Sequence, residues 1–211
     1  MDRGKFITVE GIEGVGKSTN IEFLSALIGE HGFAVSCTRE PGGTPMAERI
    51  RAMLLEHGDE PLPDIAELLL FFAARSLHVC NTIKPALEAG TWVVCDRFTD
   101  ASRAYQGGGR GLDMRTIDTL SAWVQDGLEP DLTILLDAST DVGMGRVRER
   151  GEADRLEIEQ VSFYQRVREG YLALAAAHPE RFAVVDASQP LALVQQQIRQ
   201  AMLRLFSDRP L

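Results

Sequence analysis

The 211-residue sequence predicts a three-layer α/β protein, in which a five-stranded parallel sheet lies between helices. Three observations lead to this prediction. Short apolar runs alternate with longer amphipathic stretches along the chain, which is the pattern of strand–helix–strand units. The first apolar run leads directly into a glycine-rich loop and then a helix. Polar motifs follow several of the apolar runs, and ligands of such sheets bind beyond the carboxyl ends of the strands.

Five apolar runs are predicted as strands. The first, KFITVE, ends at the glycine-rich loop, and the second, FAVSCT, ends in the motif TREPGGT. The third, TWVVC, ends in an aspartate–arginine pair, and the last two read LTILL and FAVVD. The predicted strands are residues 5–10, 33–38, 91–95, 132–136 and 182–186.

The amphipathic stretches between these runs are predicted as helices. Pro85 is expected to kink or end the third helix, because proline lacks an N–H group and its ring clashes with the preceding turn. No repeat, low-complexity tract or long linker divides the chain, so one domain over residues 1–211 is predicted. The predicted helices are residues 17–30, 44–56, 63–89, 99–106, 113–126, 139–149, 157–177 and 190–206.

Composition and charge exclude several classes of protein. Hydrophobic residues at 45% and charged residues at 25% are ordinary for a globular protein. The net charge of −9 argues against broad binding to nucleic acid or to an anionic membrane, since both of these partners are negative. An anionic ligand must therefore be attracted by a local cluster of arginines.

The cysteines and the apolar runs bear on location. Cys37, Cys80 and Cys95 lack the paired spacing of a metal site, and Cys37 and Cys95 are expected to be buried free thiols at strand ends. A strand begins by about Lys5, which leaves no room for a signal peptide. The longest apolar run, residues 68–74, is too short to span a bilayer. A cytoplasmic protein is expected.

The segment GIEGVGKS, residues 11–18, matches the phosphate-binding loop pattern of glycine, four residues and Gly-Lys-Ser/Thr. Its glycines let backbone N–H groups turn toward phosphates, and the following helix directs its positive N-terminus at them. Lys17 would contact the β- and γ-phosphates, and Ser18 would offer its hydroxyl to Mg²⁺. The alternative is a glycine-rich turn capped by Ser18. The predicted ATP-binding loop residues are Gly11, Ile12, Glu13, Gly14, Val15, Gly16, Lys17, Ser18 and Thr19.

Two classes of protein could use this loop: an enzyme that transfers phosphoryl to a small acceptor, and a GTPase-type switch. A switch usually carries Asn-Lys-x-Asp for guanine, and neither Asn20 nor Asn81 begins that motif. Arginines that could hold a second anion instead follow two predicted strands, at Arg39 and Arg97. A surface arginine at 39 and a structural ion pair at residues 96–97 are the alternatives.

Two aspartates are candidates for helping to hold Mg²⁺. An aspartate that ends a buried strand beside a phosphate-binding loop commonly binds the ion or its waters. Asp96 ends the third predicted strand beside Arg97, whereas Asp137 ends the fourth without an arginine neighbour and ranks second. The predicted metal site is therefore Ser18 and Asp96.

These motifs together resemble the thymidylate kinase family. GIEGVGKS, TREPGGT, DRF and AYQGGGRG (residues 104–111) occur in the order and at the spacing of that family, along nearly the whole chain. The resemblance implies the P-loop kinase fold and an ATP- and Mg²⁺-dependent transfer of phosphoryl to dTMP. The product would be dTDP, for dTTP and DNA precursor synthesis, and the enzyme would commonly be a homodimer. Another nucleoside monophosphate kinase is the enzyme alternative.

The resemblance also implies an acceptor site. Glu13 would hold the sugar 3′-hydroxyl, and Arg39 and Arg97 would bind the dTMP phosphate. By the same resemblance, Phe72 would stack on thymine and Arg75 would bond its edge. The two residues lie three apart on one helical face, so one ligand could meet both. Without the family, Phe72 in LLLFFAA would be assigned to the core.

Three further acceptor residues come from the fourth motif and its preceding residues. Ser102 would bond the base, and Tyr105 would crowd the 2′ position of the sugar and so disfavour ribonucleotides. Gln106, next in the motif, completes the predicted substrate-binding set. Ordinary helix packing is the alternative for Tyr105.

A basic segment, GRVRERGEADR at residues 145–155, is predicted as part of a short lid at about residues 145–156. Read alone it is a solvated basic helix end. Some members of the family carry an arginine inside the P-loop and others carry it in the lid, and here the loop position is Gly14. The lid arginines would therefore contact ATP, with Arg150 catalytic beside Lys17, Asp96 and Arg97. The other lid arginines are Arg146, Arg148 and Arg155.

Overall fold

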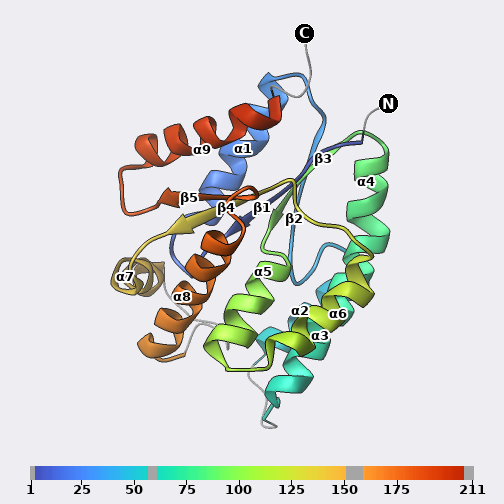
Figure 1. Cartoon of the computed structure of the whole chain (residues 1–211), viewed down its shortest axis with the longest axis vertical. Coiled ribbons are helices and arrows are strands. Elements are labelled where there is room, and N and C mark those ends of the chain that lie inside the picture. The colour runs from blue at the N-terminus through green and yellow to red at the C-terminus, as the bar shows by residue number, and fades with distance from the viewer. Residues whose placement is uncertain (1–2, 57–60, 151–158, 207–211) are drawn as a thin grey trace.

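The computed structural model describes residues 3–56, 61–150 and 159–206, without the side chains of residues 148–150. Its five strands form one parallel sheet in the order β2-β3-β1-β4-β5 (Figure 1). Each predicted strand is confirmed to within two residues at either end. The strands are β1 (Phe6–Glu10), β2 (Val35–Arg39), β3 (Trp92–Asp96), β4 (Leu132–Asp137) and β5 (Phe182–Asp186).

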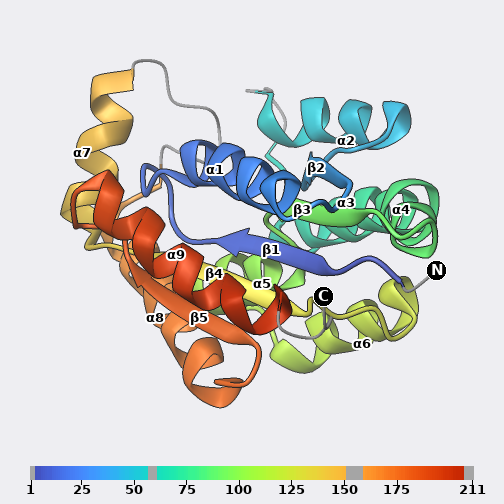
Figure 2. The ribbon, with the colours of Figure 1, turned by 90° about the horizontal axis from the view of Figure 1, so that it is seen from above.

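Helices cover both faces of the sheet, so the predicted three-layer fold is confirmed. Figure 2 shows α1 and α9 on one side of the sheet and α4, α5 and α6 on the other. The helices of the described residues are α1 (Lys17–Glu30), α2 (Pro45–Leu55), α3 (Asp64–His78), α4 (Lys84–Glu88), α5 (Thr99–Ser102), α6 (Met114–Gln125), α7 (Thr140–Arg150), α8 (Val161–Ala177) and α9 (Leu191–Phe206).

Alternation along the strands decides which side chains meet which layer. Ile7 and Val9 of β1 belong to the large apolar cluster that includes Leu24 and Ile28 of α1. Phe6, on the opposite face, packs in a second cluster with residues of β3 and α4. Successive side chains of a strand point to opposite faces, so a run that is apolar throughout is buried by helices on both sides.

Two π-helical segments, Val79–Ile83 (η1) and Arg103–Gly109 (η2), extend α3 and α5. The helix predicted at 63–89 therefore does not end at Pro85 but passes through η1 into α4. The proline ring would meet the carbonyl of residue 81, which lies inside the wider π turn. The helix predicted at 99–106 is found, and it continues as η2 to Gly109.

The cysteine expectation is only half right. Cys95 on β3 is buried, whereas Cys37 and Cys80 are exposed. Cys37 lies on β2, the edge strand of the sheet, and an edge strand is covered less completely than a central one. Among the described residues, no helix is both long and apolar enough to cross a membrane.

The carboxyl ends of the central strands meet at one edge of the sheet. Asp96 of β3 pairs with Val9 of β1 on one side and with Arg39 of β2 on the other. The glycine-rich loop after β1, the TREPGGT motif after β2 and the Asp-Arg pair at the end of β3 therefore start from neighbouring points. This register brings three distant motifs into one site.

Candidate active site

A cavity of about 550 Å³ lies beyond these strand ends. It is lined by residues of the glycine-rich loop, the turn after β2, helix α3, the end of β3, and η2. Most of the residues predicted for the donor and acceptor sites line it together. They are Glu13, Gly14, Gly16, Lys17, Ser18, Thr19, Arg39, Arg75, Asp96, Arg97, Ser102, Tyr105 and Gln106.

The glycine-rich loop adopts a conformation that side chains would oppose. Gly11, Gly14 and Gly16 all have positive φ, at 139°, 74° and 89°, and Gly16 precedes the first turn of α1. The side chains of Ile12 and Val15 are buried in the core, which leaves only their backbone for a ligand. These two buried side chains thus anchor the loop in the core, and the loop backbone remains available to a ligand at the N-terminus of α1.

Lys17 folds back over this loop. Its Nζ donates to the carbonyl oxygens of Gly11 at 3.3 Å and Ile12 at 2.9 Å. Burial, and then the nearby Arg97 guanidinium, lower the pKa of Lys17 to about 8. A phosphate oxygen beside Nζ would favour the charged form, so an anionic ligand and this lysine are complementary.

Helix α7 packs against the loop and explains the glycine at position 14. A Cβ atom at Gly14 would lie 2.0 Å from the carbonyl oxygen of Gly143. An arginine in the loop would therefore clash with the backbone of α7. Arg146 of α7 donates instead to the Gly14 oxygen at 3.3 Å and to the Ala187 oxygen at 3.4 Å. The side chains of Arg148 and Arg150, and the whole of Arg155, lie outside the described residues.

Arg97 connects the end of β3 to the glycine-rich loop. Its backbone has a φ of 66°, a left-handed conformation that is uncommon for arginine. Its guanidinium donates to the Gly11 oxygen at 3.0 Å, to Tyr171 Oη at 3.2 Å and to Glu13 Oε1 at 2.9 Å. The same group lies over the Tyr105 ring, 4.7 Å from its centre.

Glu13 and Tyr105 complete this network. The Tyr105 hydroxyl donates to the Glu13 carboxylate at 2.8 Å, and burial raises the pKa of Tyr105 well above its usual value, so the phenol stays protonated. Three of the four residues predicted for sugar and phosphate, Glu13, Arg97 and Tyr105, thus form one cluster anchored on the glycine-rich loop, whereas Arg39 lies outside it.

The buried carboxylate of Glu10 supports the loop that carries Arg97. Its two oxygens accept from the Phe98 N–H and from the Tyr171 hydroxyl, both at 2.7 Å. Burial, with the nearby Asp100 carboxylate, raises the pKa of Glu10 to about 8. The Glu10 side chain therefore holds both Phe98, the residue that follows Arg97, and Tyr171, which accepts a hydrogen bond from Arg97.

Arg39 reaches the cavity from the end of β2, with 53% of its side chain exposed. It pairs with Glu48 Oε2 at 2.9 Å. Glu48 also accepts from the Gly43 N–H at 3.0 Å, and this contact and the Arg39 pair lower the pKa of Glu48. Arg51, which sequence reasoning missed, lines the same wall and donates to the Pro41 oxygen.

The prediction for the stacking aromatic residue is wrong. Phe72 is 2% exposed and packs with Leu68 and Ile117 between α3 and α6, away from the cavity lining. Phe71 lines the cavity instead, four residues before Arg75. Both the three- and four-residue spacings place two side chains on one helical face, so LLLFFAA could not distinguish them.

The Asp96 carboxylate has one buried oxygen, Oδ1, without a hydrogen-bond partner among the described residues. Both oxygens of Asp137, by contrast, are occupied by Arg168, at 2.7 and 2.8 Å. Of the two aspartates, only Asp96 lines the large cavity with Ser18. The described residues contain no cluster of three metal-ligating side chains. A cation here would draw further ligands from phosphate and water, as Mg²⁺ commonly does.

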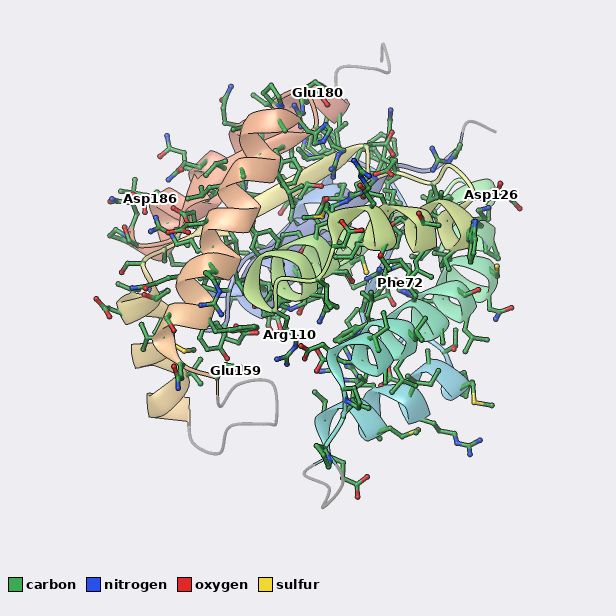
Figure 3. All side chains as sticks on the ribbon, turned by 60° about the horizontal axis from the view of Figure 1, so that its bottom comes forward. Phe72, Arg110, Asp126, Glu159, Glu180 and Asp186 are labelled. Atoms are coloured by element: carbon green, nitrogen blue, oxygen red, sulfur yellow. The ribbon has the colours of Figure 1, made fainter. Side chains whose placement is uncertain are left out.

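Sequence reasoning also missed an ion cluster at the cavity wall. Arg110 donates to the buried Glu67 at 2.8 Å and to Glu159 at 2.9 Å. Figure 3 shows Arg110 and Glu159 facing each other between the start of α8 and helix α3. Gln106 donates to the same Glu67 at 3.0 Å. Arg110 stands in the motif AYQGGGRG, which was the available signal.

Comparisons with known proteins agree with this geometry. A family model described as thymidylate kinase matches residues 9–198. Thymidylate kinases of Methylococcus capsulatus and Chromohalobacter salexigens are each 57% identical, over 92% and 94% of this chain and 93% and 94% of their own. The crystal structure of thymidylate kinase from Ehrlichia chaffeensis superposes with a TM-score of 0.75 at 33% identity, covering 95% of this chain and 99% of that one. The chain therefore belongs to the thymidylate kinase family.

Proposed function

We propose that this protein transfers the γ-phosphoryl group of ATP to dTMP and releases dTDP and ADP. One observation carries the proposal: a single cavity is lined both by the phosphate-binding loop and by two strand-end arginines, Arg39 and Arg97. A donor phosphate on Lys17 and an acceptor phosphate on Arg39 and Arg97 would then meet at the ends of β1 and β3. The family relationship supports the choice of ATP and dTMP.

The donor half consists of the loop backbone, Lys17, Ser18 and Asp96. The loop N–H groups and Lys17 would bind the β- and γ-phosphates. Ser18 and the free oxygen of Asp96 would hold Mg²⁺, which, when bound, neutralises charge on the phosphates. In the transfer, an acceptor phosphate oxygen bonds to the γ-phosphorus while the bridging oxygen leaves with ADP.

The acceptor half must bring one anion up to another. Arg39 and Arg97 would neutralise the dTMP phosphate and orient it through paired N–H groups, which the single ammonium of lysine cannot reproduce. The phosphate is already a nucleophile, so positioning and charge stabilisation account for the catalysis. Arg97 is especially suited to this because Gly11 and Glu13 hold it against the donor loop.

The part of the acceptor site that would bind the nucleoside would select the substrate. Glu13 and Tyr105 would border the sugar, with Tyr105 excluding a 2′-hydroxyl. Phe71 takes the stacking role proposed for an aromatic residue of α3, and Arg75 with Ser102 would hydrogen-bond the base edge. Gln106 also lines the cavity.

The lid and the assembly complete the proposal. Arg146 contacts the loop backbone already, and Arg150 would add charge when the lid at about residues 145–156 closes over ATP.

We infer a homodimer through α3 and α6. These two helices touch each other and expose Leu69 and Trp123, the latter at 78%. The net charge of −9 supports the absence of nucleic-acid or membrane partners. The single domain and the cytoplasmic location stay predictions.

The function is tested by a coupled assay of ADP formation with dTMP, dUMP, dCMP, UMP, GMP and no acceptor. We expect the highest kcat/KM with dTMP, and Lys17→Ala should lower turnover by about 100-fold or more. Lys84→Ala, which removes a surface ion pair with Asp126, is the matched control and should keep normal turnover. Slow hydrolysis that is equal with and without an acceptor would instead indicate a nucleotide switch.

The adjacent phenylalanines of α3 give opposite predictions. Phe71→Ala should raise the KM for dTMP about 5- to 150-fold, because base–aromatic stacking contributes roughly 1–3 kcal/mol. Phe72→Ala should lower the free energy of unfolding by about 3–5 kcal/mol, because it leaves a cavity in the core. Steady-state kinetics and urea unfolding of both variants separate the roles. Loss of stability in Phe71→Ala with an unchanged KM would contradict the assignment.

Neutralising Arg150 should lower kcat while leaving the KM for dTMP nearly unchanged. A charge delivered by a closing lid acts mainly in the transition state, and such an arginine contributes about 10³-fold or more. Four single alanine variants at 146, 148, 150 and 155 and the quadruple variant would be measured, with Arg115→Ala of α6 as the control for lost surface charge. Wild-type turnover in the quadruple variant would show that the lid supplies no catalytic charge.

A further inference from the structure

A chain of four polar side chains, three of them buried, leads from β2 to the cavity. Thr38 Oγ1 and His78 Nε2 are 2.7 Å apart, and His78 Nδ1 lies 3.0 Å from Glu40 Oε1. The other carboxylate oxygen, Glu40 Oε2, accepts from Arg75 Nε at 2.6 Å. These three contacts join the four residues in the linear order Thr38, His78, Glu40 and Arg75.

Burial makes this chain rigid. His78 is 0% exposed, Arg75 1% and Glu40 4%. Because Glu40 gives one oxygen to His78 and the other to Arg75, the histidine fixes the rotation of the carboxylate. The carboxylate in turn fixes the guanidinium plane and neutralises its charge.

The guanidinium of Arg75 is nearly saturated on its other side as well. Its Nη2 donates to the Phe98 oxygen and to Ser102 Oγ, both at 3.1 Å. Within the part of the chain that the structure describes, Nη1 is the nitrogen left without an acceptor, although it is buried. Arg75 lines the cavity, so this donor is held for a ligand atom.

His78 also supports the loop that carries a proposed phosphate-binding residue. A Cβ atom on Gly43 would come within 2.3 Å of His78 Cδ2, so the loop backbone lies directly on the imidazole. Thr82 Oγ1 donates to the Gly43 oxygen at 3.0 Å and fixes the same loop. Glu40 directly follows Arg39 in the chain. One histidine thus touches both the loop of Arg39 and the carboxylate that orients Arg75.

We propose that His78, acting through Glu40, is a positioning residue that aims Arg75 Nη1 at the 4-oxo group of the pyrimidine and so sets selectivity against a 4-amino base. The proposal rests on the role of Arg75 proposed above. A guanidinium can only donate hydrogen bonds. It therefore matches the 4-oxo acceptor of thymine or uracil and opposes the 4-amino donor of cytosine.

The test measures kcat and KM for dTMP, dUMP and dCMP with wild-type enzyme and five variants. His78→Leu removes the donor to Glu40, and His78→Asn offers an amide N–H that can replace it. Thr38→Val removes the far end of the chain. Arg75→Met removes the base-reading group, and His31→Leu is a matched control at a histidine that stacks on Phe206 outside the cavity. Melting temperatures are recorded for all variants.

In His78→Leu we expect the KM for dTMP and dUMP to rise together by about 10-fold, since misaligning a hydrogen bond from a charged group loses roughly 1.4 kcal/mol. The KM for dCMP and for ATP should stay within about twofold, so the dTMP/dCMP preference falls while the dTMP/dUMP preference does not. His78→Asn should restore the preference for dTMP over dCMP, Thr38→Val should show a smaller loss, and His31→Leu should match wild type.

Two results would overturn the proposal. One is an equal loss with all three acceptors in His78→Leu, which would mean that the histidine only supports the fold. The other is a dTMP/dCMP preference that His78→Leu leaves unchanged and Arg75→Met abolishes. That result would support the role of Arg75 in reading the base and would show that His78 has no part in that role. If Arg75→Met itself kept the preference, the proposed role of Arg75 would fail first.

Discussion

The hydrogen bonds between Arg97 and the glycine-rich loop are the interaction on which the rest of the site depends. Arg97 belongs to the end of β3 and touches the Gly11 carbonyl and the Glu13 carboxylate, which belong to the loop after β1. Two strand ends that would otherwise serve separate ligands are thereby joined at a single guanidinium. A phosphate held by Arg97 must lie next to a phosphate held by the loop, and proximity of this kind accounts for much of the rate of a bimolecular transfer.

The fold maintains this contact through buried groups that do not line the large cavity. Glu10 holds the Phe98 N–H and the Tyr171 hydroxyl, and Tyr171 in turn contacts Arg97. This support accompanies the left-handed backbone at Arg97, which is unfavourable for a side chain of its size. On the donor side, the close approach of α7 to Gly14 excludes a loop arginine, and in the proposed function the lid arginines would supply the positive charge instead. The donor and acceptor sites are therefore shaped by the same packing around β1.

Much of this could be predicted from the sequence, because the motifs are local and the parallel sheet places strand ends together. The strands, the P-loop and the grouping of Arg39, Asp96 and Arg97 follow from such patterns. The choice between Phe71 and Phe72 depends instead on the rotation of α3 against α6, which no short motif records. The exposure of Cys37 depends likewise on the edge position of β2. The pairing that occupies both oxygens of Asp137 depends on a distant residue, Arg168. The chain from Thr38 to Arg75 joins β2, the following turn and α3 through tertiary contacts, so no local pattern of residues indicates it.

A double-mutant cycle tests the central role of Arg97 most directly. The kcat/KM for dTMP would be measured for Arg97→Lys, Glu13→Gln, the double variant and wild type. Because the two side chains contact each other across the donor and acceptor sites, we predict an interaction free energy above about 1 kcal/mol, in the range of contacting residues. Losses that add to within about 0.5 kcal/mol, as for independent sites, would contradict the account.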